Sequence, residues 1–234
     1  MRIYIKLIFA LFFISLGHAN AVTVDELIAK NIEARGGLEK VKAIHSLRLT
    51  GKVQFDSFQL SYVFMAKRPS MMRNEASFQQ MTAVTAYDGS VGWKIQPFMG
   101  RVDPEKMSGD EIKPLQLNAD IDGPLVDYKA KGNTVEYLGT EDVDGTDAYK
   151  LKVTLKNGDI RQIYLDPDYF LEIRWIDQVF IRGTQQEVET DLGSYEKVEG
   201  VYWPFSYEVG QKGKPKGQKI TFEKAEINPD LDDN

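Results

Sequence analysis

FQLSYVFMAKRPSMMR, residues 58–73, is the stretch that decides the fold. Every second residue in its first part is apolar: Phe58, Leu60, Tyr62, Phe64 and Ala66. Because successive side chains of a β-strand point to opposite faces, this alternation predicts a strand with one apolar face. One further step of the same parity reaches Arg68, and Pro69 follows it directly.

Arg68 is unexpected at the end of an apolar face. Pro69 disfavours helical backbone at the residue before it, so Arg68 should stay extended and point to the same side as Phe64 and Ala66. A buried guanidinium without acceptors is costly. We therefore expect Arg68 to have acceptors, which the unpaired carbonyl groups at the C-terminal ends of helices within 108–131 could supply.

The same alternation recurs on both sides of this strand. Residues 46–55 place Leu47, Leu49, Val53 and Phe55 on one face. Further strands are predicted at 71–78, 81–87, 91–95, 134–140, 148–155, 160–166, 171–180, 186–196, 201–210 and 219–227. Their connections are short, and no strand–helix–strand rhythm is present, so about a dozen strands should form one antiparallel sheet.

Two helices are predicted before the first strand. Thr23 and Glu26 have the spacing of a capping box, in which each side chain pairs with a backbone donor of the first helical turn. The glycine pair 36–37 should end this helix, and a second short helix should follow at 38–44. Their apolar stripes favour packing on the sheet.

Residues 102–132 interrupt the strand pattern. Ser108 and Glu111 form a second capping-box spacing, and Gly123-Pro124 precedes the segment 125–131. We expect two or three short helices here, inserted between strands. Together with the N-terminal helices they are the only material available to cover the apolar face of the sheet, so the predicted fold class is mainly β with α.

The N-terminus has the pattern of a secretory signal peptide. Residues 1–21 contain Arg2 and Lys6, an apolar run at 7–16, and a small-residue cleavage signature that ends at Ala21. The apolar run is too short to span a bilayer, which needs about twenty residues. We expect cleavage after Ala21, a mature chain in the periplasm, and one domain that covers 22–234.

Composition limits the function classes. The chain has no cysteine, which excludes a disulfide scaffold. Its formal net charge is −6, and removing the two basic residues of the signal peptide makes the mature chain more acidic still. An acidic domain argues against binding to nucleic acid and against bulk adsorption to an anionic membrane. We expect a monomer.

The sequence contains no recognisable catalytic or metal-binding motif. His45 is the single histidine of the mature chain, so no zinc site of ordinary composition can be built. The acidic run 141–147 departs from a calcium loop because its glycine comes too early, and a hairpin turn explains it better. We therefore predict no catalytic residue, no metal and no cofactor.

Two features leave alternatives open. The loop GQKGKPKGQK, residues 210–219, is basic in an acidic protein. A solvated hairpin tip is the favoured interpretation, and a docking patch for an acidic partner or a lipid headgroup is the alternative. The many aromatic side chains could form a packed core or line a cavity that opens when the helices lift.

Several short motifs resemble the LolA-like family of periplasmic lipoprotein-sorting proteins. They are Lys67-Arg68-Pro69, then Asp88-Gly89 with Trp93, then Pro97-Phe98. The later segments YLGTEDVDGTDAYKLKV (137–153), GDIRQIYLDPDYFLEIR (158–174) and YEKVEGVYWPFSYEV (195–209) are similar to proteins labelled as outer-membrane lipoprotein-sorting. The likeness extends over nearly the whole mature chain, and the order of the motifs carries it.

This resemblance implies a fold and a function. The fold would be an unclosed antiparallel β-barrel, or half-barrel, with short helices as a lid over an apolar cavity. The function would be that of a carrier without enzymatic activity, which binds acyl chains of lipoproteins or lipids and delivers them towards the outer membrane. An inner-membrane transporter or an outer-membrane receptor would be the partner. A lipid-sensing regulatory module of the RseB type, without transport, is the alternative.

The resemblance also assigns a role to Arg68, which would bond to the lid and hold the ligand-free form closed. Arg68→Leu is then expected to leave folding intact, and to tighten ligand retention or impair release. The residues predicted to bind ligand are Leu47, Leu49, Leu60, Tyr62, Phe64, Arg68, Met72, Trp93, Ile112, Leu115 and Trp175, with Ile112 and Leu115 on the lid.

Overall fold

The computed structural model describes residues 22–181 and 183–232, so the predicted signal peptide lies outside the described residues. The strands are β1 (Ser46–Phe55), β2 (Phe58–Lys67), β3 (Met71–Phe78), β4 (Met81–Tyr87), β5 (Gly92–Gln96), β6 (Arg101–Lys106), β7 (Thr134–Val143), β8 (Thr146–Thr154), β9 (Ile160–Leu165), β10 (Glu172–Ile181), β11 (Thr184–Val198), β12 (Val201–Gln211) and β13 (Gln218–Ile227). The helices are α1 (Val24–Ala34), α2 (Leu38–Lys42) and α3 (Gly109–Asn118), and a 3₁₀ turn, η1, spans Pro97–Met99.

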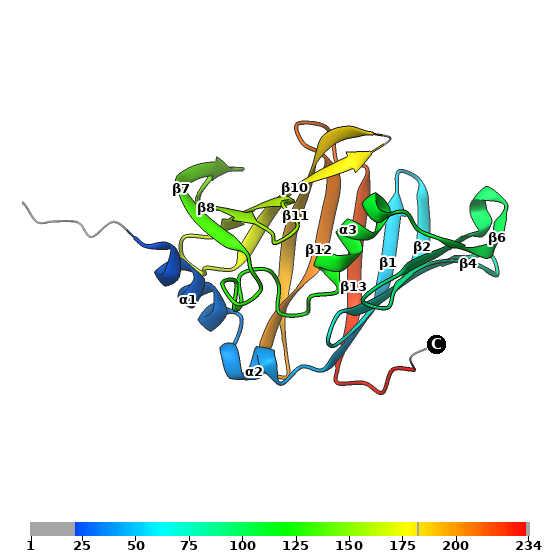
Figure 1. The fold of residues 1–234 in the computed structure, drawn as a ribbon, viewed down its shortest axis with the longest axis horizontal. Coiled ribbons are helices and arrows are strands. Elements are labelled where there is room, and N and C mark those ends of the chain that lie inside the picture. Colours follow the sequence, from blue (N-terminus) through cyan, green and yellow to red (C-terminus); the bar gives the residue numbers. More distant parts are fainter. Residues whose placement is uncertain (1–21, 182, 233–234) are drawn as a thin grey trace, which may run out of the picture.

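All thirteen of these strands belong to one antiparallel sheet in the order β6-β5-β4-β3-β2-β1-β13-β12-β11-β10-β9-β8-β7. Neighbours in the sheet are neighbours in sequence, except where β1 pairs with β13. The outermost strands β6 and β7 do not pair with each other, so the sheet curls without closing (Figure 1). The predicted antiparallel, unclosed half-barrel is confirmed, and every strand predicted from the sequence is present.

Residues 101–132 differ from the prediction in two ways. Arg101–Lys106 forms β6 on the edge of the sheet, where Trp93 pairs with Lys106. Pro104 lacks an amide donor but is tolerated because an edge strand leaves one side unpaired. The expected helix at 125–131 is a series of turns, since Asp127 adopts left-handed backbone (φ 52°) that a right-handed helix cannot contain.

The two capping boxes are confirmed, and each of the three helices covers a different part of the inner face. In α1, Leu27 and Ile28 pack on β8 and β9, whereas Val41 of α2 packs near the start of β1. In α3, Leu115 packs on Met72 of β3 and on β4. Figure 1 shows α1 and α2 at the lower end of the curved sheet and α3 in its middle. The inner face between these contacts is left uncovered.

Gly51 allows the sheet to curl sharply at its centre. The register between β1 and β13 shifts at Thr50 and Gly51, which marks a β-bulge. A Cβ atom at Gly51 would lie 2.1 Å from the backbone oxygen of Thr221, closer than any side chain can approach. Glycine at this position therefore permits β13 to approach β1 closely, and this approach shapes the inner face.

Gly51→Ala should destabilise the fold by roughly 2 kcal/mol or more, because the new methyl group collides with backbone that cannot move aside. Thermal and denaturant unfolding will measure the change. Gly193→Ala is the matched control, since Gly193 also lies within a strand and a Cβ there would meet no atom within 4 Å. Equal stability of the two variants would contradict the role assigned to Gly51.

Candidate ligand-binding cavity

The inner side of the sheet encloses a cavity of about 540 Å³. This volume lies in the range of about 300–1,000 Å³ that is typical of small-molecule sites. Its walls come from β1, β2 and β9–β13, and α3 with the following residues 119–124 covers one side. We call α3 together with residues 119–123 the lid.

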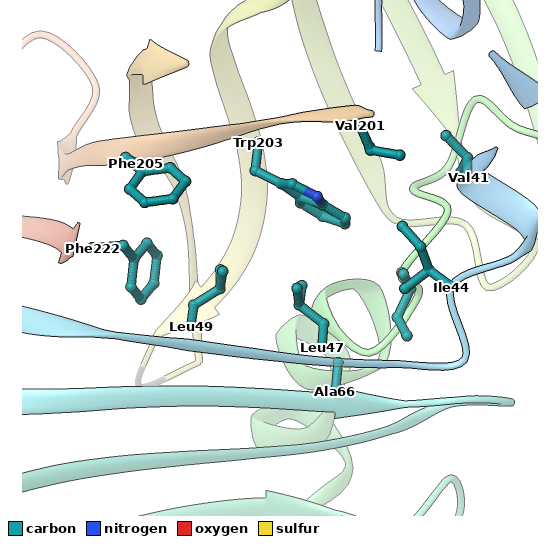
Figure 2. Close-up of a cluster of buried hydrophobic side chains, with 10 residues drawn as sticks. Val41, Ile44, Leu47, Leu49, Ala66, Val201, Trp203, Phe205 and Phe222 are labelled. Carbon is teal, nitrogen blue, oxygen red and sulfur yellow. The ribbon is translucent and has the colours of Figure 1, made fainter. Parts of the chain in front are cut away.

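Two strands that are not neighbours face each other across the closed end of this cavity. Leu47 and Leu49 project from β1 towards Trp203 and Phe205 of β12, while Phe222 lies between them on β13 (Figure 2). Val41 and Ile44 from the α2 region pack against the same group. These buried side chains form a dry floor, and the cavity begins where their packing ends.

A chain of four aromatic rings runs across the cavity wall. The ring centres of Tyr62 and Phe222 are 6.0 Å apart, those of Phe222 and Tyr207 are 5.8 Å apart, and those of Tyr207 and Trp175 are 6.1 Å apart. Burial raises the pKa of the Tyr62 and Tyr207 phenols well above their usual value, so both phenols stay neutral. The wall therefore presents broad, uncharged aromatic surface to a ligand.

The charged groups beside this aromatic chain are paired. Arg161 donates two hydrogen bonds to Asp177, at 2.6 Å and 2.7 Å, and its guanidinium lies 4.3 Å from the centre of the Trp175 ring. The indole N–H of Trp175 donates to the buried carboxylate of Glu172. Because the charges of Arg161 and Asp177 cancel, this pair adds no net charge to the wall, while the Glu172 carboxylate is held by the indole N–H of Trp175.

Arg68 connects the lid to the floor. Its side chain donates to both carboxylate oxygens of Asp122, at 2.5 Å and 3.0 Å, and to the carbonyl oxygens of Val41 and Ile44 at the end of α2. Lys42 also donates to the Asp122 carboxylate, at 2.8 Å. Arg68 is 26% exposed and has the expected acceptors, but they are the carbonyl groups of Val41 and Ile44, in and just after α2, and a lid carboxylate. The expected carbonyl groups of the 108–131 helices are not involved.

Asp122 is the centre of this junction. Its side chain is only 3% exposed, and Arg35 donates to its backbone oxygen at 2.6 Å. Burial alone would raise the pKa of the Asp122 carboxyl, but hydrogen bonds from Arg68 and Lys42 outweigh burial and hold the pKa at about 2. The carboxylate is therefore ionised at neutral pH. It joins α2 and the residue after β2 to the lid, and the backbone oxygen of Asp122 joins the end of α1 through Arg35.

Five of the predicted ligand-binding residues lie on the cavity wall. They are Leu47, Leu49, Tyr62, Phe64 and Trp175. Leu60 lies on the same face of β2, closer to the hairpin tip and beyond the cavity. Arg68 stands behind the floor, as described above. The five side chains therefore share one wall of the cavity.

The remaining predicted residues lie elsewhere. Met72 of β3 packs on Ile112 and Leu115 of α3, and the apolar lid side chains that line the cavity are instead Pro114, Leu117 and Ile121. Trp93 is 44% exposed on the outer face, because β5 places Gly92 and Lys94 on the inner side. Ile112 lies close to Gly92, and Lys94 forms an ion pair with Glu111 of α3.

The residues predicted to bind ligand include none from the last two strands, β12 and β13. Trp203, Tyr207 and Val209 of β12 line the cavity, as do Ile220 and Phe222 of β13. The signal was present, since every second residue from Val201 to Val209 is large and apolar: Val201, Trp203, Phe205, Tyr207 and Val209. β13 pairs with β1 at the centre of the sheet, and β12 and β13 supply two of the four rings of the aromatic chain.

The basic loop at 210–219 is tied to the sheet by ion pairs. Lys212 pairs with Glu187, Lys216 pairs with Glu189, and Lys219 pairs with Glu208. These contacts favour the hairpin-tip interpretation of the loop.

Within 22–181 and 183–232, no group of three or more His, Cys, Asp or Glu side chains could hold a metal ion. No helix among the same residues has both the length and the apolar character needed to cross a membrane.

Asp122→Asn should lower the free energy of unfolding at pH 7 by about 2–3 kcal/mol, because it weakens charge-assisted hydrogen bonds to Arg68 and Lys42. The pKa of Asp122 is lower in the folded protein than its usual value of 3.8. Its ionised form therefore stabilises the fold above pH 4, and this contribution disappears as the pH falls towards about 2. Denaturant unfolding of both proteins across this range should show the difference shrinking.

Asp127→Asn is the control for this experiment. Asp127 belongs to the same segment but is half exposed, and its ion pair is with Lys42. Exposed ion pairs contribute little, so this variant should change stability by less than about 1 kcal/mol. If both variants are equally stable at pH 7, Asp122 is not the centre of the junction.

Solved structures with the same architecture identify the fold. No protein-family model matches the sequence, and no curated protein matches it. A DUF1329 family protein from Desulfovibrio piger has a TM-score of 0.60 at 14% identity, and the match covers 90% of this chain and 95% of that one. A LolA superfamily protein from Nitrosomonas europaea has a TM-score of 0.58 at 13% identity, with 91% and 96% covered.

A putative outer membrane lipoprotein-sorting protein domain from Vibrio parahaemolyticus has a TM-score of 0.58 at 11% identity, with 88% and 93% covered. These matches extend over most of both chains and include the unclosed sheet and its helices. The chain therefore has a LolA-like fold, an unclosed antiparallel half-barrel with short helices on its inner side.

Proposed function

We propose that this protein is a periplasmic carrier that holds acyl chains of a lipoprotein or lipid in its cavity and delivers them towards the outer membrane. The observation that carries the proposal is the cavity of about 540 Å³ whose wall includes a chain of aromatic rings and several aliphatic side chains. The similar structure from Vibrio parahaemolyticus, described as a lipoprotein-sorting domain, supports the same class of cargo. The sequence of residues 1–21 supports export from the cytoplasm.

The energetics of such a cavity suit an acyl chain. Burying one methylene group contributes about 0.8 kcal/mol, so about ten methylenes supply enough free energy for tight binding. Tyr62, Tyr207 and Trp175 offer flat surfaces that do not require one particular chain length. The walls are therefore suited to a class of lipids, with little selection for the length of the chain.

The same groups argue for binding without covalent chemistry. Arg161 and Asp177 are committed to each other, and the phenols of Tyr62 and Tyr207 are held neutral. A general acid or base needs a pKa near the working pH, and burial moves these phenols away from it. We therefore assign the protein a carrier role and no enzymatic activity, with one domain over residues 22–234.

The Arg68 junction supplies a means of release. Its hydrogen bonds to Asp122, Val41 and Ile44 stabilise the arrangement in which the lid lies against the floor. A ligand must compete with these bonds if its binding displaces the lid, and the bonds re-form when the ligand leaves. The closed, empty state is thus the reference to which the carrier returns.

Ile220→Trp should weaken binding of a hydrophobic fluorophore at least tenfold, because the larger side chain on β13 fills part of the cavity. Thr221→Trp is the matched control, since the neighbouring residue is exposed on the outer face of the same strand. Fluorescence titration of both variants measures the effect. The cavity assignment fails if both variants bind the probe as the wild type does.

Arg68→Leu should slow dissociation of a bound fluorophore roughly tenfold, because loss of the charge-assisted hydrogen bonds penalises the closed state. Stopped-flow dilution of the loaded protein measures this rate. Arg73→Leu removes an arginine from the neighbouring strand β3, where it pairs only with Glu75, and should leave the rate unchanged. A wild-type rate for Arg68→Leu would show that the junction does not control release.

Mass spectrometry of protein purified from its own periplasm tests the cargo directly. We expect acylated molecules to co-purify with the wild type and to be depleted in Ile220→Trp. If the wild type carries no acylated molecule and also binds no hydrophobic fluorophore, the carrier proposal is wrong.

A further inference from the structure

The connections between strands lie at the two ends of the strands. We call these two ends of the half-barrel its edges, as distinct from the outermost strands β6 and β7, and they carry different connections. At one edge lie the tips of β1–β2, β3–β4 and β5–β6, because consecutive antiparallel hairpins alternate between edges. The opposite edge carries the connections 68–70 and 88–91 of the same strands, with the sequences RPS and DGSV, and neither presents an exposed large apolar side chain. Farther along this edge, the connection 166–171 presents a single one, Tyr169.

The three hairpin tips at the first edge each present two large apolar side chains. These side chains are Phe55 with Phe58, Phe78 with Met81, and Phe98 with Met99. The first two pairs are opposite each other in the strand register, and the third lies in η1. All six are between 40% and 68% exposed, although large apolar side chains are usually buried. We call these six side chains the apolar tips.

The apolar tips continue the apolar inner face beyond the cavity. Phe55 and Phe58 have the parity of Leu49 and Phe64, and Leu60 lies between the tip of β2 and the cavity wall. The cavity reaches towards the same edge through Val188, Val209 and Ile220. No helix among the described residues covers this end, whereas the Arg68 junction closes the other end.

The charge at this edge differs from that of the chain as a whole. The tip segments 55–58, 78–81 and 97–102 contain one acidic residue, Asp56, and one basic residue, Arg101. All charged residues of the neighbouring loop 210–219 are lysines. Three of them, Lys212, Lys216 and Lys219, form ion pairs with acidic residues on β11 and β12. The part of this edge formed by the apolar tips and the loop 210–219 is thus close to neutral or weakly basic on a chain with a net charge of −6, and an anionic bilayer would not repel it.

We infer that the apolar tips are a docking surface for a lipid bilayer. Three separate protruding pairs of side chains do not make one flat patch for a folded partner, but they suit a fluid interface that has no shape of its own. Phenylalanine and methionine at hairpin tips can enter the headgroup region while the glutamine pair Gln79-Gln80 remains hydrated. The open end of the cavity then faces the membrane, where an acyl chain can pass between the two.

Flotation with lipid vesicles tests this inference on the mature protein. Vesicles of phosphatidylcholine, alone or mixed with phosphatidylglycerol, should both carry the wild type upwards in a density gradient. Phe58→Ser, Phe78→Ser and Met99→Ser should each reduce binding roughly five- to tenfold, and the triple variant should remain at the bottom. Because apolar contact dominates, the two vesicle compositions should differ little.

Tyr169→Ser is the matched control. Tyr169 is 72% exposed in the connection between β9 and β10, at the edge opposite the apolar tips, and its removal should leave flotation unchanged. Thermal unfolding of every variant checks that exposed substitutions leave the fold intact. If the wild type does not float, or the triple variant floats equally well, the inference is wrong.

Two further outcomes separate this inference from its alternatives. Ile220→Trp should lose fluorophore binding and still float, whereas the triple variant should bind the fluorophore in the absence of vesicles and fail to float. Failure of the membrane surface and failure of the carrier role are thus distinguishable. A wild type that sediments as a dimer, does not float, and becomes a monomer in the triple variant would assign the apolar tips to a contact between two copies.

Discussion

The need to cover the apolar inner face of a very wide sheet governs the whole structure. Burial of apolar surface is the main favourable term in folding, and the helices of the described chain must supply that cover. The helix α1 covers β8 and β9, and α3 covers β3 and β4, while α2 covers only the lower end of the centre. The strands at the centre, β1, β13 and β12, therefore bend towards one another at Gly51 and cover part of their own surface. What remains uncovered is the cavity.

Much of this arrangement can be read from the sequence, because it follows from local periodicity. The alternation of apolar and polar residues predicts every strand except β6. It also predicts that Leu47, Leu49, Tyr62 and Phe64 share the inner face of the sheet, where they line the cavity. The failures arise where tertiary contacts decide. In the short segment VGWKI, the odd residues are apolar and indicate an inward face for Trp93. The pairing of Lys94 with Glu111 and the contact of Gly92 with Ile112 orient the even residues inwards instead.

Arg68 illustrates the same limit. Its parity and the following Pro69 correctly indicate a guanidinium that points inwards and requires acceptors. Which acceptors it meets depends on how a segment more than 50 residues away returns to the end of β2, and no local pattern contains that information. Asp122 is a single acidic residue among many in the sequence. Only the folded chain shows that it is buried between Arg68 and Lys42.

The way in which the lid is held limits how it can open. One end of α3 is tied to β5 by Glu111 and Lys94, and the segment after α3 is tied to β2 by Asp122 and Arg68. Hydrogen bonding to Lys94 lowers the pKa of Glu111 to about 2, and the pKa of Asp122 is also about 2. Both carboxylates stay ionised throughout the neutral and mildly acidic range, so a moderate fall in pH cannot free the lid. The apolar contacts of the lid are made by Ile112, Leu115 and Ala119 on the side of β3 and β4, and by Pro114, Leu117 and Ile121 on the side of the cavity. Displacement of the lid therefore requires an interaction that replaces its apolar contacts, and the ion pairs define the position to which the lid returns.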